Sequence, residues 1–225
     1  MKTLIKILCL SVLWFSCDNP TEPEEDNNHI RGYVYNNSGE PVENASIFLT
    51  YEVEPISRPT LTMTLSIAEA SIVNIWITDF CDSIVSNLVD NEMYDAGTYD
   101  LTWDATDNIG NQVTNGQYNI YVEAGGQEAT QSIFLQSMEY NNLESIEGYN
   151  YHALTDDEGY FSIPIECLSF GVIQTITFES GNDLGEFIIP HTIKLSIFHE
   201  DDGFYESDFY EVDSETGLNI DITLP

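Results

Sequence analysis

The residue types that most often perform catalysis or bind metals are scattered along this 225-residue chain without a recognised spacing. No histidine belongs to a His-x-x-x-His or His-Glu-x-x-His pattern, and no Cys-x-x-Cys pair is present; these spacings are typical of zinc sites. The sequence also lacks a Gly-x-Ser-x-Gly nucleophile turn and a glycine-rich phosphate loop. We therefore predict that the protein is not an enzyme and has no transition-metal cofactor; its histidines are His29, His152, His191 and His199.

Carboxylates are so abundant that no pair stands out as a general acid and base. The chain has 39 Asp and Glu against 5 Lys and Arg, for a formal net charge of −34. This charge excludes nucleic acid as a partner, because phosphate binding requires Lys and Arg. The acidity is typical of a solvated surface in a salty habitat, and the alternative is that some carboxylates bind Ca²⁺.

The best calcium candidates lie close together in one segment: Asp104, Asp107 and Asn111. Their spacing differs from the Asp-x-Asp-x-Asp-Gly of an EF-hand. The same side chains can instead cap a turn through hydrogen bonds to nearby backbone N–H groups. We predict the turn, keep calcium as the alternative, and expect no other cofactor.

The first seventeen residues have the composition of an export signal. Lys2 and Lys6 accompany an apolar run, Ile5–Phe15, which ends at Ser16 and Cys17. A basic start, an apolar run of about 7–15 residues and a small residue at the cleavage site are typical of a secretory signal. Such an apolar run is too short to span a bilayer. Because it ends on Ser-Cys, the segment resembles a bacterial lipoprotein signal. The resemblance implies a lipid on Cys17; the alternative is an ordinary cleaved signal with an incidental cysteine.

Two further cysteines, Cys81 and Cys167, remain in the exported part of the chain. In an oxidising compartment they can pair as a disulfide. Pairing requires their Cα atoms to lie within about 7 Å, which the sequence does not reveal. A disulfide between different domains and two unpaired thiols both stay open.

Short alternating segments separated by Gly, Asn and Asp dominate the chain after an acidic stretch, 18–28, that is typical of an extended tether. Period-two alternation over such runs predicts antiparallel sheets with one buried face. No window has the pattern of a long amphipathic helix, so the predicted class is all-β, in sandwiches. The clearest alternating runs are Leu61–Ile67, Tyr99–Trp103, Tyr118–Ala124 and Leu218–Leu224.

Two separated segments resemble a carboxypeptidase regulatory-like domain. Ile30–Leu49 has a strand, a turn built on Gly39 and Pro41, and a second strand that begins with the small Ala45. The Thr-Asp-x-x-Gly-x-Phe signature of that family follows only at Thr155–Phe161. The resemblance implies a non-catalytic, transthyretin-like sandwich that is split by about a hundred residues.

The intervening segment is similar to the Ig-like domain of the flagellar hook-capping protein, which recurs in secreted proteins and in sorting domains of the type IX secretion system. Ala96–Tyr121 follows nearly all of the family's pattern, from Ala-Gly-Thr-Tyr through Leu-Thr-Trp-Asp to Gly-Gln-Tyr, with Ala105 in place of a glycine. The family is non-catalytic. Trp103 is expected to fill the core of this domain.

These observations predict an Ig-like sandwich at residues 55–140 inserted into a regulatory-like sandwich built from 29–53 and 142–225. Residues 1–17 would be the lipoprotein signal and 18–28 the tether. The expected function is a structural, adhesive or binding module, anchored by its lipid in the bacterial cell envelope. We expect the outer membrane, on its periplasmic or outer side, with an unidentified protein or glycan partner. The alternatives are a hydrolase or accessory subunit acting on extracellular glycans and a component of a secretion or gliding assembly.

Overall fold

The computed structural model describes residues 28–53, 61–136, 140, 146, 148–177 and 183–225, and their regular structure is almost entirely β. Among these residues, no helix is long and apolar enough to cross a membrane. The all-β prediction is confirmed. In chain order the strands are β1 (His29–Tyr35), β2 (Ser46–Tyr51), β3 (Leu61–Ile67), β4 (Ser71–Thr78), β5 (Ile84–Tyr94), β6 (Gly97–Trp103), β7 (Gly116–Ala124), β8 (Gln127–Leu135), β9 (Ala153–Leu154), β10 (Tyr160–Pro164), β11 (Ile173–Thr177), β12 (Asp183–Ile188), β13 (Thr192–His199), β14 (Gly203–Glu211), β15 (Leu218–Asn219) and β16 (Ile222–Thr223), with a 3₁₀ turn, η2 (Ile165–Cys167), after β10.

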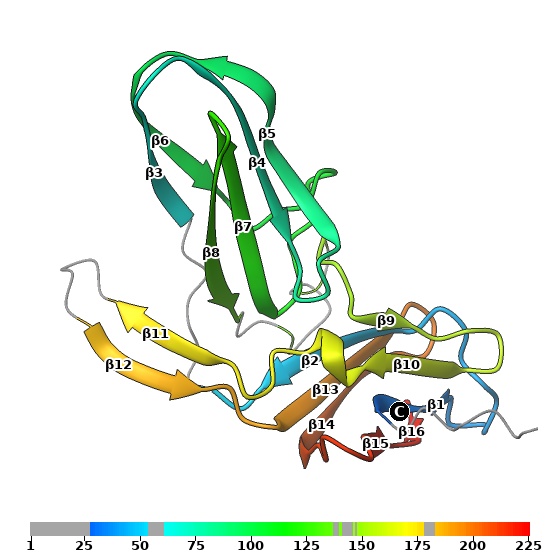
Figure 1. The fold of residues 1–225 in the computed structure, drawn as a ribbon. Helices are drawn as coiled ribbons and strands as arrows, with labels where there is room; N and C mark the ends of the chain where they lie inside the picture. The colour runs from blue at the N-terminus through cyan, green and yellow to red at the C-terminus, as the bar shows by residue number, and fades with distance from the viewer. Residues whose placement is uncertain (1–27, 54–60, 137–139, 141–145, 147, 178–182) are drawn as a thin grey trace, which may run out of the picture.

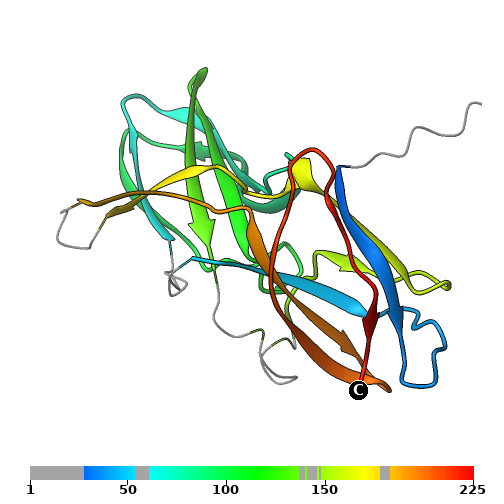
Figure 2. The same ribbon diagram turned by 90° about the horizontal axis from the view of Figure 1, so that it is seen from below.

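Strands from both ends of the chain share the same sheets. β1 pairs antiparallel with β10 and parallel with β15 and β16, so the first strand lies beside the last ones (Figure 2). A second sheet has the order β14-β13-β2-β9, and β11 and β12 form a two-stranded ribbon (Figure 1).

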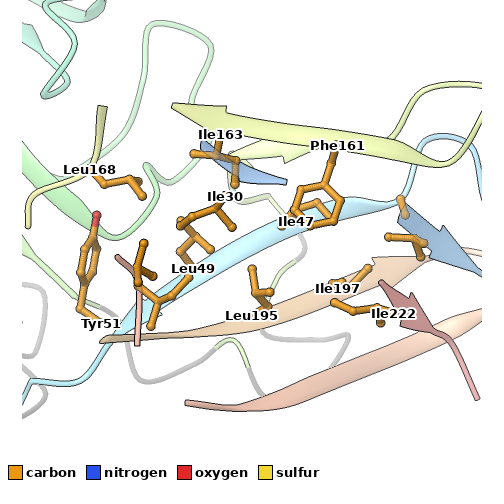
Figure 3. Close-up of a cluster of buried hydrophobic side chains, with 14 of the residues drawn as sticks. Ile30, Ile47, Leu49, Tyr51, Phe161, Ile163, Leu168, Leu195, Ile197 and Ile222 are labelled. Atoms are coloured by element: carbon orange, nitrogen blue, oxygen red, sulfur yellow. The ribbon is translucent and has the colours of Figure 1, made fainter. Parts of the chain in front are cut away.

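The first hydrophobic core lies between these sheets. Ile47 and Leu49 of β2 alternate with residues that face the other way, and their side chains are fully buried (Figure 3). They pack with Ile30 of β1, Phe161 of β10 and Leu195 of β13. Each side chain of this size contributes about 1.5–3 kcal/mol when it is fully removed from water.

The second core is formed by β3 to β8. A two-stranded sheet, β3-β6, packs against a four-stranded sheet of order β5-β4-β7-β8 (Figure 1). Trp103 is buried at the end of β6, as predicted, and its indole N–H donates to the carbonyl of Thr106 at 2.9 Å. Its ring meets the edge of Tyr118, with the ring centroids 5.5 Å apart.

The alternating runs at 61–67, 99–103 and 118–124 coincide with β3, β6 and β7. The run at 218–224 was predicted as one strand, whereas the structure divides it into β15 and β16. The backbone N–H of Ile220 still donates to the carbonyl of Arg31. At the next position the side chain of Asp221 accepts from the N–H of Tyr33, at 3.1 Å, in place of a backbone carbonyl. A side-chain acceptor therefore interrupts the ladder.

Every strand of the second core lies between β2 and β9 in the sequence. In the described sheets, β3 to β8 pair only with one another, and the remaining strands pair only among themselves. The domain boundaries at 53, 55, 140 and 142 stay a prediction, because residues 54–60 and most of 137–147 lie outside the described residues.

Candidate functional site

A disulfide joins the loop after β4 to the turn η2. Cys81 and Cys167 are bonded, with their Cα atoms 4.9 Å apart and a sequence separation of 86 positions. The pairing that the sequence left open is therefore formed in the structure. It links a loop of the second core to a turn of the first, because Ile165 and Leu168 beside Cys167 belong to the first core.

Asn115, which precedes β7, is the centre of a buried hydrogen-bond network between the two cores. Its side-chain amide donates to the carbonyl of Leu49 in β2, at 2.9 Å, and its backbone N–H donates to the hydroxyl of Tyr140. His152 lies between the same two segments. Its Nδ1 accepts from the N–H of Leu49 at 3.1 Å, so its Nε2 carries the proton and donates to the carbonyl of Asn115 at 3.0 Å.

Gln136 attaches the end of β8 to the edge of β2. Its side-chain oxygen accepts from the N–H of Tyr51, and its amide donates to the carbonyl of Tyr51, both at 3.0 Å. The amide thus reproduces the pairing that a neighbouring strand would provide. Just before it, Phe134 of β8 enters the first core and meets Tyr51 edge to face, with the ring centroids 5.5 Å apart.

A third set of contacts connects β7 with the segment after η2. The hydroxyl of Ser169 accepts from the N–H of Gln117 at 2.8 Å, and Gln174 donates to the side chain of Gln117 at 2.7 Å. Ser169 also donates its backbone N–H to the hydroxyl of Tyr51, whose pKa is raised by burial. The interface between the cores therefore combines the Phe134 contact with buried hydrogen bonds, and a satisfied buried network of this kind favours one relative placement of the two cores.

Sequence reasoning did not identify these residues. Asn115 lies inside the Ala96–Tyr121 segment that follows the family pattern, which gives it no role of its own, and Gln136 and His152 belong to no spacing pattern. Single polar residues become recognisable only when the fold shows which backbone groups they meet.

Burial and two hydrogen bonds, one accepted and one donated by the ring, determine the protonation state of His152. Burial lowers its pKa from 6.5 to about 4, and the hydrogen bond to the carbonyl of Asn115 opposes this only in part. The neutral ring is therefore the form that holds the two cores together. Protonation would remove the Nδ1 lone pair that accepts from Leu49.

This geometry predicts an acid-sensitive interface. The folded protein binds fewer protons at His152 than the unfolded chain between pH 6.5 and about 4, so stability falls as the pH drops through that range. The contribution amounts to about 3 kcal/mol at the acid end. In His152→Gln the side chain can still accept from Leu49 and donate to Asn115, but it does not titrate. Urea unfolding of the variant should match the native chain at pH 7.5 and should lose about 3 kcal/mol less by pH 4. Equal losses in both proteins would show that His152 does not carry this effect.

The calcium candidates are turn residues in this structure. Asp104 accepts from the N–H and the hydroxyl of Thr106, at 3.2 and 2.6 Å. One oxygen of Asp107 accepts from the N–H groups of Ile109 and Asn111, both at 2.9 Å. Both residues thus make the side-chain-to-backbone bonds that the sequence predicted for a turn.

The second oxygen of Asp107 accepts from the side chain of Asn150 at 3.1 Å. Partial burial raises the pKa of Asp107, but the hydrogen bonds from Asn150 and from the N–H groups of Asn111, Ile109 and Gly110 outweigh it and hold the pKa below its usual value. Among the described residues, no group of three or more His, Cys, Asp or Glu side chains is arranged to hold a metal ion.

A cleft of about 450 Å³ opens beside this turn, where the two cores meet. Tyr151 and Ile109 are exposed at its rim. An aromatic ring can stack on a small polar ligand, and neighbouring amide and carboxylate groups can form hydrogen bonds with it. The cleft is lined by Asp79, Val85, Ile109, Asn111, Val113, Thr114, Tyr118, Tyr149, Asn150 and Tyr151.

The predicted lipid site, Cys17, lies outside the described residues. The described chain begins at Asn28, immediately before β1, where the acidic segment 18–28 ends.

Comparison with known proteins identifies one region of the chain. Residues 57–128 match the family model of the FlgD Ig-like domain. No curated protein matches the chain. The match coincides with β3 to β7 and the start of β8, so the second core is supported as an Ig-like domain, and Ig-like sandwiches commonly serve as structural or binding modules.

Proposed function

We propose that this protein is a non-catalytic binding module of the bacterial cell envelope, held at the membrane by a lipid on Cys17. The observation that carries the proposal is the Ig-like domain, fixed by a disulfide and buried hydrogen bonds to a second β-core. Two β-cores joined in this way hold their loops and edge strands in fixed relative positions, as a binding surface requires. Fold alone does not define a ligand, so the binding role rests on the surfaces described here.

The N-terminal sequence supports the membrane anchor. A lipid on Cys17 would be separated from β1 by the eleven residues 18–28, which reach at most about 36–40 Å when fully extended. That segment is rich in Asp, Glu, Asn and Pro and has no apolar side chain, so its composition favours a solvated tether.

Contacts between the two distant signature segments support a regulatory-like outer domain. The hydroxyl of Thr155 accepts from the N–H of Ala45 at 2.8 Å and donates to the carbonyl of Val42 at 2.6 Å. Gly159 packs against Pro41 and Val42 of the first segment. Residues more than a hundred positions apart thus form one turn structure, as a domain interrupted by an insertion requires.

Fractionation of cells that produce the full precursor tests the anchor. The native chain should partition with membranes, and Cys17→Ala should move almost completely to the soluble fraction or accumulate as an uncleaved precursor. Cys9→Ala is the matched control, because Cys9 lies within the apolar run and would leave with the signal. Membrane association that is unchanged in a processed Cys17→Ala protein would overturn the proposed lipid anchor.

A further inference from the structure

The open side of the Ig-like domain contains a long groove between β3 and β8. Two adjoining hollows of about 500 and 360 Å³ follow these strands, and Leu65, Val122 and Ala129 line both. The groove is closed at one end by the β3–β4 turn and by the β7–β8 turn, which contribute Ala68 and Gly125. β8, which borders the groove, is the edge of its sheet opposite β5 (Figure 1).

The groove exists because the two sheets differ in width. The two-stranded sheet β3-β6 faces a four-stranded sheet, so no second described sheet covers the part of the broader sheet at β8. Ala129 and Gln131 of β8 stand opposite Val122 and Ile120 of β7, and residues directly opposite in a ladder point to the same face. Ile120 is buried in the core, yet Ala129 and Gln131 on that face are exposed.

Both strands that border the groove are edges of their sheets. Within the described part of the chain, β3 pairs only with β6, and β8 pairs only with β7. An edge strand presents a row of backbone donors and acceptors that an added strand can use. Along β3, Met63 and Leu65 face the core while Thr62, Thr64 and Ser66 are exposed. A strand paired to β3 would therefore place alternate side chains over Ala129 and Gln131.

Charge selects the kind of strand that fits. Residues 61–135 contain eleven Asp and Glu and no Lys, Arg or His. Glu69 of the β3–β4 turn and Glu128 of β8 border the groove. A second copy of this equally acidic chain would be repelled, whereas a cationic segment would be attracted.

Two segments of the chain that lie outside the described residues are poor occupants by sequence. Residues 18–27 are acidic and have no apolar side chain to enter the groove. Residues 54–60 contain Pro55 and Pro59, which cannot donate to a β-ladder.

We propose that the groove binds an extended, basic segment of another polypeptide, which adds to β3 as a third strand and covers the exposed face of β8. The added strand alternates apolar residues, which enter the groove, with Lys or Arg, which face solvent near the acidic surface. Backbone hydrogen bonds to β3 supply affinity, and the alternation supplies specificity. This inference names a partner class for the proposed binding role and rests on that role, but it does not depend on the lipid anchor.

The test uses the full mature chain and a synthetic nine-residue peptide that alternates valine and lysine. Isotope-labelled protein is titrated with the peptide, and amide shifts and hydrogen exchange are recorded by NMR. We expect saturable shifts confined to the strands and turns that line the groove, on β3, β6, β7 and β8, with slower exchange of β3 amides. Ala129→Trp fills the groove and should weaken binding by roughly tenfold or more. Thr102→Trp, on the exposed outer face of β6, is the matched control and should leave affinity nearly unchanged.

Peptide controls separate strand addition from charge attraction alone. A peptide of the same composition with its valines and lysines in separate blocks should bind at least about tenfold more weakly, and an alternating valine–glutamate peptide should not bind. Equal binding of the block peptide, shifts outside the groove, or full affinity in Ala129→Trp would overturn the proposal. Protection of β3 in the protein alone, rising with its concentration, would assign the groove to self-association and also overturn it. Because no arm requires a membrane, failure here leaves the anchor proposal intact, and a processed Cys17→Ala protein that stays with the membranes would overturn the anchor but leave this proposal intact.

Discussion

Replacing Cys81 and Cys167 together by serine should lower the free energy of unfolding by about 4 kcal/mol, given a closed loop of this length. The bond spans 86 residues, and unfolded chains without it gain the conformational freedom of that entire loop. The loss is expected to exceed that of any single buried hydrogen bond at the junction, which contributes about 1 kcal/mol.

Urea unfolding of the double variant and of the native chain, each with and without reductant, measures this effect. Reductant should bring the native chain to the stability of the double variant and should leave the variant unchanged. A double variant within about 0.5 kcal/mol of the native chain would mean that the disulfide does not stabilise the fold, since unremarkable surface changes have effects of that size.

Gly159→Ala should destabilise the first core by about 3 kcal/mol or more, because two independent penalties combine. Gly159 has φ of +76°, which alanine adopts at a cost of about 1–2 kcal/mol. In addition, a Cβ at this position would come within 2.6 Å of the carbonyl oxygen of Val34 in β1. That oxygen belongs to the backbone of strand β1, so it cannot move aside as the end of a flexible side chain would.

Gly39→Ala is the matched control for this prediction. Gly39 has φ of +81°, nearly the same as Gly159, but no atom lies within 4 Å of the position its Cβ would take. It should therefore lose only about 1 kcal/mol, the backbone penalty alone. Thermal and urea unfolding of both variants distinguish the two costs. Similar losses in both would contradict the close packing of Gly159 against β1 and the Pro41–Val42 turn.

The fold class could be predicted from the sequence because the alternation of apolar and polar residues indicates which face of each strand is buried. The runs at 61–67, 99–103 and 118–124 became strands, and Trp103 became a core residue. Turn chemistry was equally local: Asp104 and Asp107 cap turns, and Gly110 has a positive φ of 92°. Ala105, which departs from the family's glycine, is held at φ of 62°, a conformation that explains the glycine.

The junction between the cores could not be predicted in the same way. Asn115, Gln136 and His152 act through backbone groups that lie 37 to 103 positions away in sequence. No local pattern encodes such contacts, because they depend on how two sheets meet. The disulfide was recognisable as an option from two cysteines, but only the folded chain brings Cys81 and Cys167 together. The groove between β3 and β8 likewise arises from the unequal widths of two sheets.

Intact-mass spectrometry of the protein isolated from its own membranes tests the central claim most directly. If the chain is a lipid-anchored envelope module, the mature polypeptide begins at Cys17, and this residue carries a thioether-linked lipid. An inhibitor of the lipoprotein signal peptidase should then cause the precursor, with residues 1–16 still attached, to accumulate. A mature protein that begins elsewhere, or an unmodified Cys17 at the N-terminus, would contradict the account.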